Sequence, residues 1–330
     1  MKLNFVNKTN TEVKTFKVPD GHLVVSDFSI KLLDEKLKEK KGVTTFISPD
    51  EAYLTADSHY LILIDKILGA KVYRLPEIEE VSSYAADEKF YGFLNLYYLF
   101  DNDKLAVVHK DLTVASSAKG DKKAAVEIYT LPYLIKESEY EIDDAMTVFS
   151  SSTSPYLFGA KGDKVNVIKD GVATELELKT NKSLVTYQDN KFYFAKENGL
   201  IMTDSDFKVI NQIEVKNNTL TPNEMNLLRH LGQSLMTITS LSDLKNLDNP
   251  SINRYRLLDF AVSEDSAFLL LVSSIDTSRR LVCLALNEDD ECEKQILDLN
   301  FSNPVTSVKV EGDILTISNN EYNYHFTIED

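Results

Sequence analysis

The stretch SPDEAYLTADSHYLILIDKILGAKVYRLP, residues Ser48 to Pro76, decides which fold class this sequence favours. It holds three short apolar runs, and the dipeptides Asp57-Ser58 and Leu68-Gly69 separate them. Three such runs joined by tight turns predict an antiparallel meander of β-strands. A meander of this size cannot bury both of its faces alone, so it must pack against similar units.

The same combination of a polar turn and an apolar run recurs along the chain. With the opening stretch, seven copies are present at an average spacing of about 44 residues, close to the length of one propeller blade. The other six begin at Asn102, Thr153, Gln188, Leu231, Ser263 and Glu311. The sequence therefore predicts an all-β protein in which residues 1–330 form a single β-propeller of seven four-stranded blades. A two-sheet or two-domain β protein is the alternative.

The ends of the chain bear on how the propeller closes. The last unit supplies three strands before Asp330, and residues 11–18 form a strand with no blade of its own. We expect this N-terminal strand to complete the last blade and close the ring, since closure removes an exposed sheet edge. A further copy, PDGHLVVSD at Pro19, would raise the count to eight, but it lies only 29 residues before Ser48. We therefore favour seven blades.

The segment SPDEAYLTADS resembles the S-P-D-G-x-x-L-x-x-x-S segment of WD-repeat-like β-propellers at Ser48, Pro49, Asp50, Leu54 and Ser58. The signature is degenerate: Gly-His pairs are missing at blade positions, and a chain without tryptophan has no Trp-Asp pair. In that family the matched residues are structural. Families that look like this commonly supply subunits of eukaryotic complexes for ribosome assembly, nuclear transport, chromosome segregation or vesicle coating. The resemblance implies a non-catalytic scaffold that binds other protein subunits.

Composition limits the partners and the compartment. A formal net charge of -16 repels phosphate backbones, which disfavours direct nucleic-acid binding except through a local basic patch. The N-terminus has no apolar core of a signal peptide, and no run of about 18 apolar residues predicts a membrane helix. We therefore expect an intracellular protein without membrane insertion. Cytoplasm and nucleus remain open alternatives.

Interruptions of a repeat often carry its contacts, and three stand out. Residues 29–42 predict a short amphipathic helix, and Lys36 and Lys40 belong to its dense basic cluster. Residues 221–232, TPNEMNLLRHLG, predict a second inserted helix with a capping box and a glycine stop. Residues 242–256 predict a long polar connection. The candidate partner-binding residues are Asn226, Arg229, His230, Lys36, Lys40, Arg254 and Arg256.

Signatures of catalysis are largely missing from the sequence. It contains no nucleophile elbow, phosphate-binding lysine loop, H-E-x-x-H or C-x-x-C motif. The five histidines lie in different units, and paired acidic residues lie at polar turns. The sequence thus predicts no catalytic, cofactor or metal site. A propeller enzyme with an axial-funnel active site and a regulator of a small GTPase are the functional alternatives.

Overall fold

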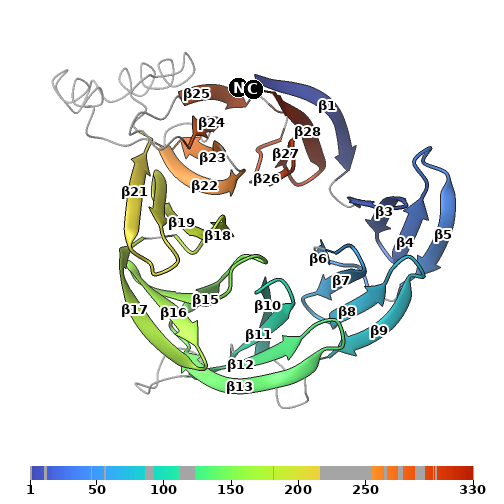
Figure 1. Ribbon diagram of the computed structural model, residues 1–330, viewed down its shortest axis with the longest axis horizontal. Coiled ribbons are helices and arrows are strands. Elements are labelled where there is room, and N and C mark those ends of the chain that lie inside the picture. The colour runs from blue at the N-terminus through green and yellow to red at the C-terminus, as the bar shows by residue number, and fades with distance from the viewer. Residues whose placement is uncertain are drawn as a thin grey trace, which may run out of the picture. The chain divides into compact units, whose positions relative to one another are not determined.

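The computed structural model of this protein describes residues 2–10, 13–45, 47–55, 57–85, 93–111, 123–180, 182–215, 255–263, 266–273, 278–286, 294–299, 301 and 303–329. Within these ranges the chain forms 28 β-strands and no helix. The strands make seven separate four-stranded sheets, numbered below in chain order (Figure 1).

Four sheets use strands β2 to β17, each sheet in sequential order. The first holds β2 (Lys14–Val18), β3 (Gly21–Ser26), β4 (Ser29–Leu33) and β5 (Glu39–Thr44). The second holds β6 (Glu51–Leu54), β7 (Tyr60–Asp65), β8 (Gly69–Arg74) and β9 (Glu79–Tyr84). The third holds β10 (Phe93–Phe100), β11 (Lys104–Asp111), β12 (Lys123–Thr130) and β13 (Ile135–Asp143). The fourth holds β14 (Thr147–Phe149), β15 (Leu157–Lys161), β16 (Lys164–Lys169) and β17 (Val172–Lys179).

The remaining three sheets follow the same plan, with one exception at the chain ends. The fifth holds β18 (Val185–Gln188), β19 (Lys191–Lys196), β20 (Gly199–Thr203) and β21 (Val209–Glu214). The sixth holds β22 (Tyr255–Val262), β23 (Ser266–Ser273), β24 (Arg279–Ala285) and β25 (Lys294–Leu299). The seventh holds β26 (Ser307–Glu311), β27 (Ile314–Ser318) and β28 (Tyr322–Glu329), followed at its edge by β1 (Lys2–Asn10).

The chain divides into two compact units. One comprises Asn10–Tyr187, and the other comprises Met1–Thr9 together with Gln188–Asp330. The all-β prediction and the count of seven four-stranded blades are confirmed. That residues 1–330 form a single domain stays a prediction.

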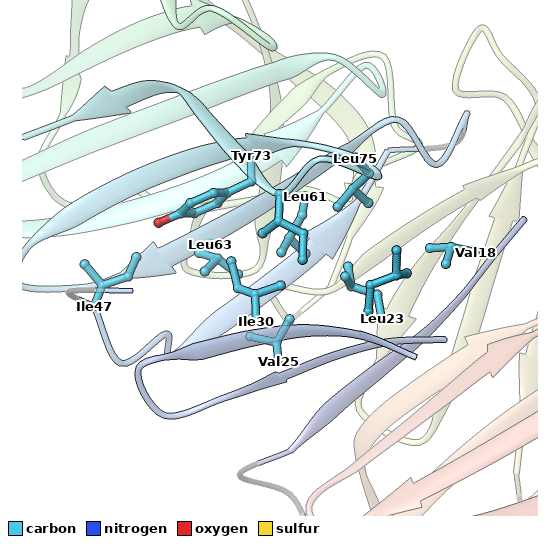
Figure 2. Packing of buried hydrophobic residues seen from close by; sticks show 11 residues of the cluster. Val18, Leu23, Val25, Ile30, Ile47, Leu61, Leu63, Tyr73 and Leu75 are labelled. Carbon is cyan, nitrogen blue, oxygen red and sulfur yellow. The ribbon is translucent and has the colours of Figure 1, made fainter. Parts of the chain in front are cut away.

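The repeated apolar run is the second strand of each sheet, and its burial explains its composition. In β7, Leu61 and Leu63 pack in one cluster with Leu23 and Ile30 of the first sheet (Figure 2). Ile62 and Ile64 point the other way and pack with Leu105 of the third sheet. A strand covered on both faces needs apolar residues at every position, because successive side chains alternate between the faces. The run LILI is therefore a consequence of sheet stacking.

The last sheet is completed by β1, which lies beside β28 (Figure 1). The Phe5 ring meets the Phe326 ring edge-on, with 5.6 Å between ring centroids, and Lys8 Nζ lies 3.2 Å from the centroid of the Tyr322 ring. His325 Nε2 lies 2.9 Å from Thr9 Oγ1. An N-terminal strand thus completes the last sheet, as expected. The expected residues 11–18 were wrong, because β2 (residues 14–18) pairs with β3 and begins the first sheet.

The contact of His325 with β1 makes an acid response testable. Burial lowers the pKa of His325 below its ordinary 6.5, although Glu311 partly opposes this. The folded chain therefore binds fewer protons than the unfolded chain just below pH 6.5, so its stability falls on acidification. We expect the urea midpoint of the wild type to decrease modestly between pH 7 and pH 5.5, and that of His325→Gln to decrease less. Equal decreases in both proteins would contradict this role of His325.

Two predictions about the first sheet need correction. The copy at Pro19 was excluded from the count of seven, yet it forms β3 of a complete sheet, because short turns fit four strands between Lys14 and Thr44. The copy at Leu231, which was counted, lies outside the described residues. The helix predicted over residues 29–42 is wrong: these residues form β4, a turn and most of β5. In β4, Ile30 and Leu32 are buried in the alternating pattern of a strand.

Candidate functional site

Large apolar side chains are exposed on two turns of neighbouring sheets. Phe28, between β3 and β4, is 51% exposed, and Ile67 and Leu68, between β7 and β8, are 87% and 55% exposed. We call these three residues the tip surface. Their backbone is held in place: Thr45 N donates to Phe28 O at 2.8 Å, and Asp65 Oδ1 accepts from the N–H groups of Ile67 and Leu68 at 2.8 and 2.9 Å.

The connection from the first sheet to the second ties these two turns together. Ser48 Oγ donates to Asp27 Oδ1 at 2.7 Å, beside Phe28. Two residues later, Asp50 Oδ2 accepts from Lys66 N at 2.8 Å, beside Ile67. The Ser-Pro-Asp that begins the opening stretch therefore anchors both turns, in agreement with a structural role. It also places the tip surface on a fixed backbone.

A second exposed surface is the hairpin between β4 and β5. Leu37, at its turn, is 66% exposed and adopts a left-handed φ of 61°. Asp34 closes the turn: its backbone O accepts from Leu37 N at 2.9 Å, and its Oδ1 accepts from Lys36 N and Lys38 N at 2.9 and 2.8 Å. We call Lys36, Leu37, Lys38, Lys40 and Lys41 the basic hairpin.

The candidate residues predicted from sequence fall into three groups. Lys36 and Lys40 come together at a shallow depression of about 400 Å³, which Pro19, Asp20, Asp34 and Glu35 also line. Arg256 lies in β22, where its side chain is exposed. Asn226, Arg229, His230 and Arg254 lie outside the described residues, as do the helix predicted over 221–232 and most of the connection predicted over 242–256. Partner binding by all of these residues stays a prediction.

Sequence reasoning missed a buried polar cluster around Glu127 of β12. Glu127 Oε2 accepts from Tyr84 Oη at 3.0 Å and from Tyr129 Oη at 2.9 Å, and Lys136 Nζ lies 2.7 Å from Oε1. His109 Nε2 lies 3.1 Å from Oε2, and Nδ1 of the same ring lies 2.7 Å from Asn95 Oδ1. All of these residues except the exposed Lys136 are buried, so their polar groups bond mainly to one another.

Hydrogen bonding keeps the carboxylate of this cluster charged. Burial acts to raise the pKa of Glu127, but hydrogen bonds from Lys136, His109, Tyr129 and Tyr84 outweigh burial and lower the pKa to about 2. A buried carboxylate that stays ionised at neutral pH and accepts hydrogen bonds from Tyr84 and Tyr129 stabilises the fold. The only sequence signal was a histidine inside an apolar strand.

Neither a metal cluster nor a membrane helix occurs within the described residues. No group of three or more histidine, cysteine, aspartate or glutamate side chains is placed there to hold a metal ion. No helix of this part of the chain could span a membrane.

Comparison with known proteins identifies the fold. No protein-family model and no curated protein sequence matches the chain. Solved structures do. The C-terminal WD40 domain of Sif2 superposes with a TM-score of 0.57 at 7% identity, covering 98% of this chain and 82% of that one. The β-propeller domain of Cps50 (Swd1) from Myceliophteria thermophila gives 0.57 at 7% identity, covering 99% and 100%. U3-55K gives 0.57 at 9% identity, covering 99% and 98%.

The chain has the fold of a seven-bladed β-propeller, as these WD40 domains do. Its strands follow the order found in such propellers, but its sequence lacks the Gly-His and Trp-Asp pairs of WD repeats at blade positions. At 7 to 9% identity the likeness concerns the fold alone. The function must therefore be argued from the surfaces of this chain.

Proposed function

We propose that this chain is a non-catalytic protein-interaction scaffold, a subunit of a larger intracellular assembly. The tip surface is the observation that carries the proposal. Its three side chains, Phe28, Ile67 and Leu68, are large, apolar and exposed on turns that hydrogen bonds hold in place. Apolar groups on a preformed backbone lose little further freedom on binding, which favours their use as anchors for a protein partner.

The fold supports the same proposal. A propeller presents many short turns on stacked sheets, and such turns can contact several proteins at once. The similar WD40 propellers share only their fold with this chain, so they support a scaffold only because the fold offers many exposed turns. The partners of this chain, in this proposal, are other protein subunits.

The described side chains give no support to the enzyme alternative. One histidine–carboxylate pair, His59 and Asp57, lies 2.9 Å apart on an exposed turn, and another, His109 and Glu127, is buried and bonded to protein groups. No substrate atom can approach the second pair without opening the sheets. No described residue specifically favours a regulator of a small GTPase over another protein-binding role.

Isolation of the tagged full-length chain from its native cells, followed by mass spectrometry, tests the proposal. We expect the wild type to recover other proteins in fixed proportion, and Phe28→Asp/Ile67→Asp to lose at least one of them. The matched control is Ile135→Asp/Val172→Asp, which makes the same change at two other exposed apolar positions. Recovery of the wild-type chain alone would refute the scaffold. Equal losses in both double variants would refute the role of the tip surface.

A further inference from the structure

The basic hairpin is a positively charged region of an acidic protein. Residues 14–44, the first sheet, contain seven lysines and five carboxylates, whereas the whole chain contains 36 basic and 52 acidic residues. Lys36, Lys38 and Lys41 are exposed, and none of them forms an ion pair among the described residues. Lys40 Nζ donates to Asp20 O at 3.1 Å. Three ammonium groups therefore project from this hairpin without a carboxylate partner in the described part of the chain.

The hairpin continues into the edge of its sheet. β5 is the last strand in the order of the first sheet, and five of its six residues are exposed. Gly42, within β5, has no left-handed φ that would require glycine, and a Cβ added there would come within 3 Å only of the flexible Glu39 carboxylate. A glycine inside a strand often marks the close approach of another backbone. Within the described ranges no strand pairs with the outer edge of β5, and lysines flank that edge.

The other outer strands of the same unit carry the opposite charge. β9 has Glu79 and Glu80, β13 has Glu137, Glu139 and Glu141, and β17 has Glu175 and Glu177. An acidic strand would be repelled from those edges and attracted to β5. Charge would therefore favour β5 over these three acidic edges, which have the same backbone pattern.

We infer that β5 binds an extended acidic segment of a partner protein by strand addition. This inference rests on the proposed scaffold function and names the kind of partner. Main-chain hydrogen bonds to the free edge of β5 supply affinity, and Lys36, Lys38 and Lys41 select carboxylates on the added strand. Leu37, exposed at the turn, adds an apolar contact for one end of the segment.

Nucleic acid fits this surface less well than an acidic peptide. Asp20 and Glu35 line the depression beside Lys36, so a phosphate there would meet carboxylates as well as ammonium groups. The net charge of -16 adds a long-range repulsion of a polyanion. A phosphate backbone also has no amide groups with which to continue a sheet.

Fluorescence anisotropy on the full-length chain tests the inference. The probes are a labelled octapeptide of alternating glutamate and valine, the same peptide with N-methyl groups on alternate residues, and a 12-nucleotide oligouridine. We expect the plain peptide to bind, and N-methylation to weaken binding at least tenfold because it removes the donors that strand addition needs. Lys36→Glu/Lys38→Glu/Lys41→Glu should weaken binding of the plain peptide about tenfold, because three exposed attractions between lysine and peptide carboxylate become repulsions. The control Lys169→Glu/Lys179→Glu/Lys208→Glu, with the same charge change on other exposed lysines, should stay within about twofold.

Several results would overturn the inference: no binding of the plain peptide, equal binding of the N-methylated peptide, binding of oligouridine alone, or equal effects of the two triple variants. Isolation from native cells separates it from the scaffold proposal. If the wild type and Lys36→Glu/Lys38→Glu/Lys41→Glu recover the same proteins in the same amounts, the role of β5 fails while the scaffold stands. If the wild type recovers no protein, the scaffold itself fails.

Discussion

Replacing Glu127 with alanine should lower the free energy of unfolding by about 3 kcal/mol, the upper end of the cost of leaving a buried polar group without its hydrogen-bond partner. Glu127 is 3% exposed and accepts hydrogen bonds from Tyr84 and Tyr129, while Lys136 and His109 contact the same carboxylate. Alanine would leave the buried hydroxyls and the imidazole without their acceptor. Urea unfolding followed by tyrosine fluorescence measures the loss.

The matched control is Glu141→Ala on the adjacent strand β13. Glu141 is exposed, so its replacement should change the free energy of unfolding by less than about 0.5 kcal/mol. Similar losses in the two variants would mean that the Glu127 cluster contributes nothing beyond an ordinary surface carboxylate.

The same cluster predicts an acid response. The pKa of Glu127 is about 2 in the folded protein, against an ordinary 4.5. The unfolded chain therefore binds more protons between these values, so the contribution of Glu127 is full above pH 4.5 and is lost as the pH falls toward 2. Glu127→Gln should be less stable than the wild type at pH 7, and the difference should shrink as the pH is lowered from about 4.5 to about 3. A difference that is constant across this range would contradict the low pKa.

The sequence was sufficient to predict the sheets because their second strands are buried on both faces. The run Leu61–Ile64 is apolar at every position, and each sheet repeats such a run close to a polar turn. Blade assignment was harder because turn lengths vary from sheet to sheet. The first sheet is so compact that its copy at Pro19 was left out of the blade count, because it lies only 29 residues before Ser48.

The wrong prediction of a helix over residues 29–42 has a local cause, a turn that also occurs in the fifth sheet. Ile30, Leu33 and Leu37 match a helical spacing, but Leu37 belongs to a turn that Asp34 closes. The sequence DSDFK in the fifth sheet makes the same turn: Asp204 O accepts from Phe207 N at 3.1 Å, and Asp204 Oδ1 accepts from Lys208 N at 2.9 Å. The pattern D-x-x-apolar-Lys after a strand therefore favours this turn in this chain.

The candidate surfaces could be predicted only in part. The lysines of the basic hairpin were visible as a cluster, but their place beside a bare sheet edge depends on the strand order. The Glu127 cluster depends on register: Asn95 pairs with His109 across β10 and β11, and no spacing along the chain indicates this. Phe28 and Ile67 looked like ordinary apolar residues next to turns. Their exposure follows from the turns at Asp27 and Asp65, which point them outward.

Gly69→Ala should be among the most damaging single changes in this protein, although it adds only one methyl group. Gly69 begins β8 within the opening stretch and has a φ of +111°, a region that other residues rarely adopt. A Cβ there would lie 2.0 Å from Tyr84 O, the carbonyl of the neighbouring strand β9. Backbone cannot rotate away as a side chain can, so β8 and β9 would have to separate at this end. We expect a loss of about 3–5 kcal/mol in the free energy of unfolding, on the scale of the largest single-residue effects.

Gly162→Ala separates the steric effect from the conformational one. Gly162 also has a positive φ, +66°, but nothing lies within 4 Å of its Cβ position. Alanine there should cost only the left-handed conformation, about 1 kcal/mol. Urea unfolding of both variants, with amide hydrogen exchange in β8 and β9, measures the two losses. If Gly69→Ala were no more destabilising than Gly162→Ala, the close approach of Tyr84 O in β9 to Gly69 would be contradicted. A large loss confined to Gly69→Ala, with faster exchange in both strands, would instead show that this glycine holds β9 in place beside the turn that exposes Ile67 and Leu68.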